Sequence, residues 1–379
     1  MFARRTHNIA LGLFKKPHVT LTRSFVSSSP IRPFHEKDTV HKEDRYCEIP
    51  NRSVIELEGV DSVKFLQGLI TNHMPRISPG GDGFYAGFLT PQGRMLFDTF
   101  IYPVNMGVNF PHPKYVIDCP TATKDIFLRH LKRYLLRSKV KVRDCSEEYK
   151  LWHVWGNASA NHLEPNLIKK DMRLSDIGCT DPRVPGFGYR AVLKTDQKIE
   201  SILPEAGDFK QLSSEEYTIR RILQGIPEGV EDIWPETSLP LESNFDYMNG
   251  VDFRKGCYVG QELTIRTYHT GVVRKRIVPI QIYTNGDTVP QTQSVDRSKQ
   301  YSLEPQKDIK LVDGSSKRGV GKLCSTVHNI GLALMRLEHV QKCVNGEQVE
   351  FCLGDDSETR FRPFLPEWWS EDEIFNKQA

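Results

Sequence analysis

The stretch Phe253-Arg254-Lys255-Gly256-Cys257-Tyr258-Val259-Gly260-Gln261-Glu262 gathers several chemically distinctive side chains in one short run. It places a single thiol after two cationic residues and before a Gln-Glu pair. Gly256 and Gly260 flank the thiol, and glycine permits a positive φ or the close approach of a ligand or another chain. The stretch therefore predicts a tight, glycine-rich loop around one cysteine.

A short helix is predicted to follow the cysteine. The segment from Val259 to Tyr268 has no proline and one glycine, and Leu263 and Arg266 fall at helix-compatible spacing. Cys257 would then precede a helix N-terminus, and that position beside cationic side chains favours the thiolate form. The functional interpretation is a reactive, partly exposed thiol. The alternative is a small buried residue in a glycine-rich turn.

The first 35 residues have the composition of a mitochondrial transit peptide. They are rich in Ser and Thr and contain no Asp or Glu, and their basic residues are Arg4, Arg5, Lys15, Lys16, Arg23 and Arg32. This pattern predicts import into the mitochondrial matrix; the alternative is an ordinary basic tail. Removing the six basic charges from the net charge of +3 leaves about −3 for the rest of the chain. A near-neutral body argues against a nucleic-acid partner.

Cysteine spacing limits the kinds of metal site that the chain can form alone. The eight cysteines contain no C-x-x-C pair, so neither a closed zinc site nor a complete iron–sulfur ligand set is expected. Any contact with a cluster would then use one thiolate shared with a partner, and no stable cluster is expected in the isolated protein. The sequence contains no run of about eighteen apolar residues, so no membrane-spanning helix is predicted.

Hydrophobic periodicity predicts an α+β fold followed by a β-barrel. Strands are expected at 84–90 and 95–103, and an amphipathic helix begins at Thr123. Strict alternation at Val278, Ile280 and Ile282 and several later short strands indicate the barrel. The expected domain boundaries are 45–268 and 269–379, and the second domain contains a polar insertion at about 284–308.

The octapeptide Lys255–Glu262 resembles the signature of YgfZ-type proteins, which are folate-binding relatives of the glycine-cleavage T protein. Further blocks of the same family follow in order, among them Thr90-Pro91-Gln92-Gly93-Arg94 and the segments 65–72 and 181–190. The resemblance implies the T-protein fold, with three subdomains around a central pocket and a C-terminal β-barrel. The transit peptide points to the mitochondrial branch, whose members assist iron–sulfur cluster assembly.

The resemblance also assigns roles to individual residues. Asp98 matches an aspartate that assists one-carbon transfer, although Arg94 or backbone N–H groups could instead satisfy it. Gln224 stands where the T protein has a glutamate that binds the pteridine, which weakens that pairing. Asn72 is either a pteridine ligand or a helix C-cap. The candidate cofactor-binding residues are Asn72, Arg94, Asp98, Gln224, Lys255, Gly256, Tyr258, Gly260, Gln261 and Glu262. Of these, Tyr258 has core packing as its alternative role. Glu262 could orient Cys257 or a basic neighbour, or it could complement a helix N-terminus.

Two functions remain open on the sequence. The first is an accessory factor for mitochondrial 4Fe-4S cluster assembly, acting with A-type scaffold proteins on aconitase-like and radical-SAM lipoate synthase-like clients. Cys257 would be its functional thiol and a transient shared metal ligand, and tetrahydrofolate is the candidate cofactor. The alternative is a folate-dependent aminomethyltransferase-type enzyme that uses Asp98. A third interpretation, folate-linked RNA modification, requires a basic face that the overall charge does not predict.

Overall fold

The computed structural model describes residues 43–104, 112–156, 174–205, 207–316, 319–354 and 356–370. The chain divides into two compact units, 1–39 and 40–379, and every described residue belongs to the second. The expected transit peptide, 1–35, lies outside the described residues. Within the described part of the chain, no helix is long and apolar enough to cross a bilayer.

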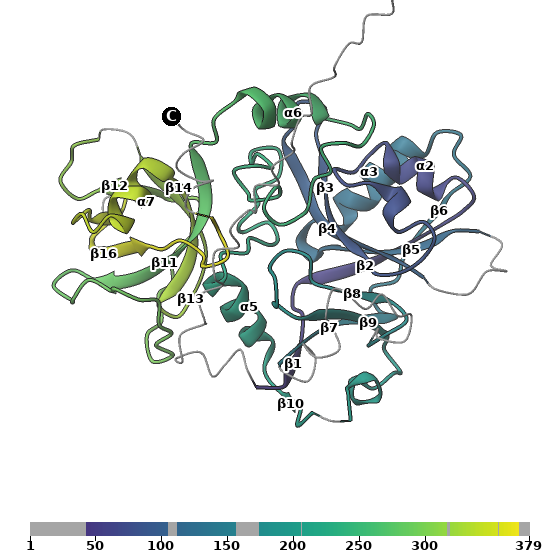
Figure 1. Ribbon diagram of the computed structural model, residues 1–379, viewed down its shortest axis with the longest axis horizontal. Helices are drawn as coiled ribbons and strands as arrows, with labels where there is room; N and C mark the ends of the chain where they lie inside the picture. Colours follow the sequence, from purple (N-terminus) through teal and green to yellow (C-terminus); the bar gives the residue numbers. More distant parts are fainter. Residues whose placement is uncertain are drawn as a thin grey trace, which may run out of the picture. The chain divides into compact units, whose positions relative to one another are not determined.

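An antiparallel five-stranded sheet, with strand order β3-β4-β5-β2-β6, forms the first layer of the fold (Figure 1). Two helices, α2 (Ser62–Gln67) and α3 (Lys124–Leu135), pack against its apolar side chains. Phe127 of α3 makes ring contacts with Phe88 and Phe97, with centroids 5.0 and 4.9 Å away. The strands are β2 (Arg52–Glu58), β3 (Phe84–Leu89), β4 (Met95–Pro103), β5 (Lys114–Pro120) and β6 (Lys141–Asp144).

A second five-stranded sheet has the order β10-β1-β7-β9-β8. Trp152, Val154 and Tyr189 pack in an apolar cluster on one face of this sheet. Leu151, Trp155 and Val192 point to the other face, where they join a cluster that also contains residues of the first sheet. Helix α5 (Ser214–Leu223) contacts both β1 and strand β14 of the C-terminal barrel, so it connects this sheet to the barrel. The strands are β1 (Arg45–Glu48), β7 (Tyr149–Trp155), β8 (Gly178–Thr180), β9 (Tyr189–Lys194) and β10 (Lys210–Gln211).

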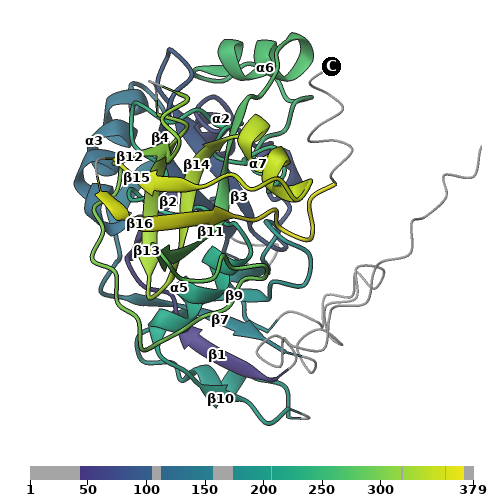
Figure 2. The same ribbon diagram turned by 90° about the vertical axis from the view of Figure 1, so that its left-hand side faces the viewer.

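The C-terminal strands close into a six-stranded barrel, as the alternation predicted (Figure 2). Val278, Ile280 and Ile282 of β11 lie in its core, because alternate residues of a barrel strand face inward. Helix α7 (Leu337–Val344) packs on β14 and β16. The strands are β11 (Lys275–Thr284), β12 (Asp308–Leu311), β13 (Gly321–Val327), β14 (Ile330–Arg336), β15 (Phe351–Leu353) and β16 (Asp356–Pro363).

The polar stretch between β11 and β12 is fastened to the barrel by hydrogen bonds. Gln281 donates to the carbonyl of Ser294 at 2.8 Å and accepts from the N–H of Ser294 at 3.0 Å. The Asp296 N–H donates to the Asn329 Oδ1 at 2.7 Å. The short 3-10 helices of the fold are η1 (Met74–Arg76), η2 (Thr121–Thr123) and η3 (Ile199–Ile202).

Candidate functional site

The cysteine loop, residues 253–260, leads into helix α6 (Gln261–Thr270) and is fixed at its end by a close backbone approach. Gly260 has φ +80°, and a Cβ atom there would lie 2.2 Å from the carbonyl oxygen of Thr90. Only glycine fits, because the left-handed backbone and the lack of space both exclude a side chain. The predicted helix therefore begins two residues later than expected, at Gln261, whose side chain accepts from the Tyr258 N–H at 3.2 Å.

Lys255 anchors the loop to the C-terminal end of α2. Its ammonium donates to the carbonyl oxygens of Gln67 and Ile70 at 2.8 and 2.5 Å, and it lies 4.6 Å from the centroid of the Tyr258 ring. Burial lowers the pKa of Lys255 to about 7, since the charged form is desolvated. The sequence suggested that this cation supports the thiol. Its hydrogen bonds instead go to carbonyl groups that the end of a helix leaves without partners.

Cys257 is the exposed thiol of the chain. All eight cysteines are described; six of the others are buried and Cys352 is half-buried. Burial raises the pKa of the Cys47 and Cys119 thiols to about 12, which keeps them protonated at neutral pH. The structure thus places Cys257 at the surface of the loop and not in a buried turn. Among the described residues, no group of His, Cys, Asp or Glu side chains forms a self-contained metal site.

The cysteine loop and helix α6 carry exposed cationic and aromatic side chains. Arg254 and Arg266 are exposed, and Tyr268 of α6 is 47 % exposed. The Tyr268 ring stacks on Phe253 with centroids 3.6 Å apart, so the two ends of the loop-helix segment are held together. Glu262 is exposed in the first turn of α6, where a carboxylate complements the helix dipole. Gly256 is exposed beside the thiol.

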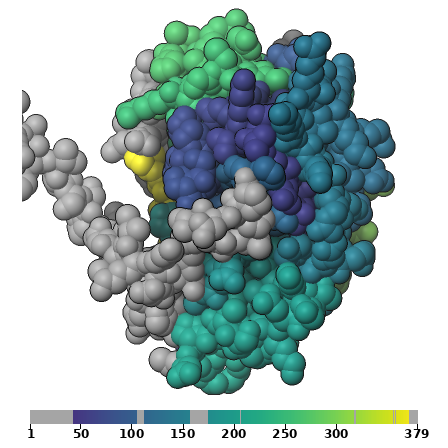
Figure 3. All heavy atoms as spheres, turned by 90° about the vertical axis from the view of Figure 1, so that its right-hand side faces the viewer, coloured from purple at the N-terminus to yellow at the C-terminus, as the bar shows by residue number. Residues whose placement is uncertain are grey.

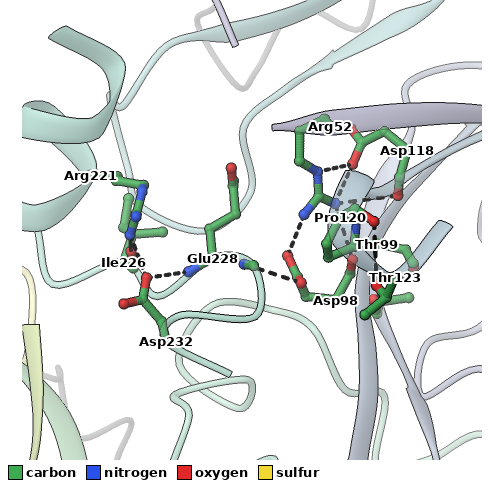
Figure 4. A network of polar contacts seen from close by, with 12 residues as sticks. Arg52, Asp98, Thr99, Asp118, Pro120, Thr123, Arg221, Ile226, Glu228 and Asp232 are labelled. Atoms are coloured by element: carbon green, nitrogen blue, oxygen red, sulfur yellow. Dashed lines mark hydrogen bonds and ion pairs between the residues drawn. The ribbon is translucent and has the colours of Figure 1, made fainter. Parts of the chain in front are cut away.

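Asp98 lies elsewhere, in a buried ion network that Figure 4 shows. The Arg52 Nη1 donates to Asp98 Oδ2 at 2.7 Å, and the Arg52 Nε donates to Asp118 Oδ1 at 2.9 Å. The Gly229 N–H donates to Asp98 Oδ1 at 3.2 Å. Arg94, the partner considered from the sequence, is exposed and donates to the Thr237 carbonyl at 2.6 Å. That suggestion was wrong, because Arg52 of strand β2, two strands away in the same sheet, binds the Asp98 carboxylate together with the Gly229 N–H.

The network continues through Arg183, Arg190 and Glu228 into the second sheet. Arg190 Nη2 donates to Asp118 Oδ2 at 2.9 Å, and Arg183 Nη1 donates to Glu228 Oε2 at 2.6 Å. Arg183 also pairs with Asp181 at 2.7 Å. With Arg52, three arginines pair with four carboxylates, so the four carboxylates, if all ionised, exceed the arginines by one negative charge.

Asp98 and Asp118 respond to this imbalance in opposite ways. Burial raises the pKa of Asp98 above its usual value, and the lowering effect of Arg52 does not overcome it. Burial also disfavours ionisation of Asp118, but Arg52 and Arg190 together hold its pKa below the usual value. Asp118 is therefore the firmly ionised member of the pair, and Asp98 is the carboxyl group that takes up a proton most readily.

The remaining predicted cofactor residues occupy separate positions. Asn72 donates to the carbonyls of Tyr85 and Asn249, both at 2.9 Å, and does not cap α2, which ends at Gln67. Gln224 is the C-cap residue of α5, and its carbonyl oxygen accepts from Trp368 Nε1 at 2.9 Å. Lys255, Gly256, Tyr258, Gly260, Gln261 and Glu262 lie together with Cys257, whereas Asp98 and Gln224 share no described partner.

Comparisons with known proteins agree with this architecture. Residues 32–187 match the GCVT N-terminal domain and residues 274–371 match the CAF17 C-terminal beta-barrel domain. The aminomethyltransferase T of the glycine cleavage system from Bartonella henselae superposes with a TM-score of 0.58 at 15% identity, over 86% of this chain and 87% of that one. That likeness concerns the fold alone, and it confirms the predicted T-protein fold with a C-terminal barrel.

Two fungal relatives decide the family. The Aspergillus fumigatus "Iron-sulfur cluster assembly factor IBA57 homolog, mitochondrial" is 43% identical over 319 residues, covering 77% of this chain and 70% of the relative. The Mycosarcoma maydis protein of the same description is 38% identical over 364 residues, covering 87% and 86%. The chain belongs to the IBA57 family of mitochondrial iron–sulfur cluster assembly factors. The family expected from the octapeptide is thereby confirmed, together with its mitochondrial location.

For this IBA57-family chain, sequence patterns missed most of the buried network. Arg52 and Asp118 lie on strands β2 and β5 among mainly apolar residues, and Glu228 lies in a loop. The signal that could have found them is a charged residue at an inward position of a strand, which is rare unless it is paired. Such a signal shows that a partner is needed but does not say which residue it is.

Proposed function

We propose that this chain is an accessory factor that matures mitochondrial 4Fe-4S enzymes, with Cys257 as a transient ligand of a cluster shared with a partner. The observation that carries the proposal is that one cysteine of eight is exposed, on a loop whose backbone is held rigidly. The relatives are named iron–sulfur cluster assembly factors. An A-type scaffold protein is the proposed partner, and aconitase-like and radical-SAM lipoate synthase-like enzymes are the proposed clients.

Ligand exchange is the chemistry that such a thiol can perform. The Cys257 thiol loses its proton to solvent, and its sulfur forms an Fe–S bond as one ligand of the partner leaves the same iron. The partner supplies the other ligands, because an iron–sulfur cluster needs several. The exposed Arg254 and Arg266 would offset the negative charge of a thiolate-bound cluster. Oxidation states do not change in this step.

Cells that lack this protein test the proposed function directly. We expect the activity of a mitochondrial 4Fe-4S enzyme such as aconitase to fall and to return when the wild-type chain is expressed. A matrix enzyme without a cluster should keep its activity, since cluster supply does not limit it. An equal fall in both enzymes, or no change in either, would contradict a role in cluster assembly.

We also propose tetrahydrofolate as a ligand near Asp98, because one buried polar group there has no hydrogen-bond partner among the described residues. The hydroxyl of Tyr85 is buried and has no hydrogen bond to a described residue, and its ring stacks on Phe245 at 4.7 Å. When bound, tetrahydrofolate would supply one-carbon chemistry, the basis of the aminomethyltransferase alternative. Both oxygens of Asp98 already accept hydrogen bonds, so binding would compete with Arg52 and Gly229.

Calorimetric titration with tetrahydrofolate tests that second candidate. Tyr85→Phe should weaken binding by about tenfold, which corresponds to one lost hydrogen bond of roughly 1 kcal/mol. Tyr134→Phe, in helix α3, is the matched control and should bind as the wild type does. If the wild type releases no heat of binding, the folate proposal fails together with the one-carbon transfer alternative.

A further inference from the structure

One surface of the protein combines unpaired basic side chains with exposed apolar ones. We call it the α3 surface: the outer side of helix α3, the turn that follows it and the edge strand β6. Figure 3 shows this side of the molecule, with the blue atoms of α3 near the purple atoms of α2. Its exposed basic residues are Arg129, Lys132, Arg133, Arg137, Lys139 and Lys141.

These six cations differ from their basic neighbours in having no ion-pair partner among the described residues. Lys124 pairs with Asp144 at 2.8 Å, and Arg143 pairs with Glu56 at 3.2 Å. None of the six has an ion pair within the part of the chain that the structure describes. From Lys124 to Lys141 the sole acidic residue is Asp125. A local excess of positive charge therefore lies on a body whose overall charge is close to neutral.

Apolar side chains project from the same surface. Leu136, at the end of α3, is 90 % exposed, and Ile126 on the outer side of the helix is 50 % exposed. Val60 is 51 % exposed, and the turn after α3 lies against its neighbours, since the Lys139 N–H donates to Asp61 Oδ2 at 2.7 Å. Leu136 adopts a positive φ of 44°, which is unusual for a leucine and holds its side chain at a projecting turn.

We propose that the α3 surface docks the protein onto an anionic phospholipid bilayer. A helix face rich in Lys and Arg with neighbouring apolar side chains is typical of peripheral membrane binding. Basic residues near an anionic surface each contribute to the attraction, and Leu136 would enter the boundary between headgroups and acyl chains. The exposed Leu136 beside these cations favours a lipid surface over an acidic protein, because the boundary of a bilayer takes up apolar side chains as well as cations.

The α3 surface and the cysteine loop are anchored at opposite ends of α2. The Lys139 N–H, in the turn after α3, donates to Asp61, which precedes α2, whereas Lys255 of the cysteine loop is bonded to Gln67 and Ile70 at the other end of that helix. The six residues of α2 separate these two ends by about 9 Å.

Vesicle sedimentation tests the proposal, using protein isolated from mitochondria so that it carries its natural N-terminus. We expect the wild type to sediment with phosphatidylcholine vesicles that contain cardiolipin, and not with phosphatidylcholine alone. High salt should release it, because salt screens exposed charges. The triple variant Lys132→Glu, Arg133→Glu and Arg137→Glu should bind on the order of a hundredfold more weakly. Leu136→Ser should weaken binding severalfold without changing the charge.

The control is Lys194→Glu with Lys198→Glu, two exposed lysines outside the α3 surface, which lowers the net charge by four where the triple variant lowers it by six. This variant should sediment as the wild type does. Equal losses in the control and the triple variant would mean that net charge, and not this surface, governs binding. Failure of the wild type to sediment with cardiolipin vesicles at low salt would overturn the proposal and leave an acidic protein as the occupant. Neither result depends on cluster assembly, because the readout is sedimentation.

Discussion

Replacing Cys257 with alanine should abolish the rescue of 4Fe-4S enzyme activity in cells that lack the protein. The sulfur is exposed, so its removal deletes the proposed iron ligand without opening a cavity in the core. The free energy of unfolding should therefore stay within about 0.5 kcal/mol of the wild-type value, as for most surface substitutions. Aconitase activity at equal expression and urea denaturation of the purified variant would measure the two effects.

Cys324→Ala is the control for this experiment. Cys324 is buried in the barrel region, and its replacement should cost roughly 1 kcal/mol of stability because it removes packed atoms. Rescue of the cluster enzyme should nevertheless remain. If both variants lose function and stability to the same degree, Cys257 acts through packing. If Cys257→Ala rescues fully, the thiol is not a ligand and the proposed exchange step is wrong.

Replacing Asp118 with asparagine should destabilise the protein by about 3–5 kcal/mol at neutral pH, the cost of breaking a buried ion pair. Asp118 accepts hydrogen bonds from Arg52, Arg190 and Tyr102, so asparagine removes the charge that pairs directly with two buried guanidinium groups. Its pKa is lowered in the folded state, so its stabilising contribution is present above the unfolded pKa and is lost as the pH falls. The difference between variant and wild type should thus shrink below about pH 4.

Asp98→Asn provides the matched comparison in the same network. Because the folded pKa of Asp98 is raised, its protonated form favours folding, and ionisation costs stability as the pH rises through the folded pKa. Asparagine is neutral like the protonated carboxyl group but keeps only one accepting oxygen, so this variant should lose one hydrogen bond and destabilise the protein by about 1–3 kcal/mol at pH 7, less than Asp118→Asn. Urea denaturation across pH measures both variants. Equal destabilisation would contradict the assigned roles of the two aspartates.

The ion-pair partners of these aspartates could not be predicted from the sequence. Asp98 was singled out through its family resemblance, but its partner Arg52 lies 46 residues earlier in the chain. The pairing arises because β2 and β4 both neighbour β5 in the first sheet. Tyr85, Arg183 and Glu228 were not expected at a site, since each has common structural roles and nothing local in the sequence indicates their convergence.

The sequence by itself determined the family, the α+β class, the C-terminal barrel and the cysteine at the centre of the candidate site. These properties depend on local patterns: an unbroken octapeptide, alternation along strands and the spacing of cysteines. Only the tertiary structure decided that Cys257 is exposed, that Lys255 binds carbonyl groups of α2 and that the carboxylates form a buried network. Such properties depend on which distant segments meet, and the desolvation that sets burial and pKa exists only after those segments have packed.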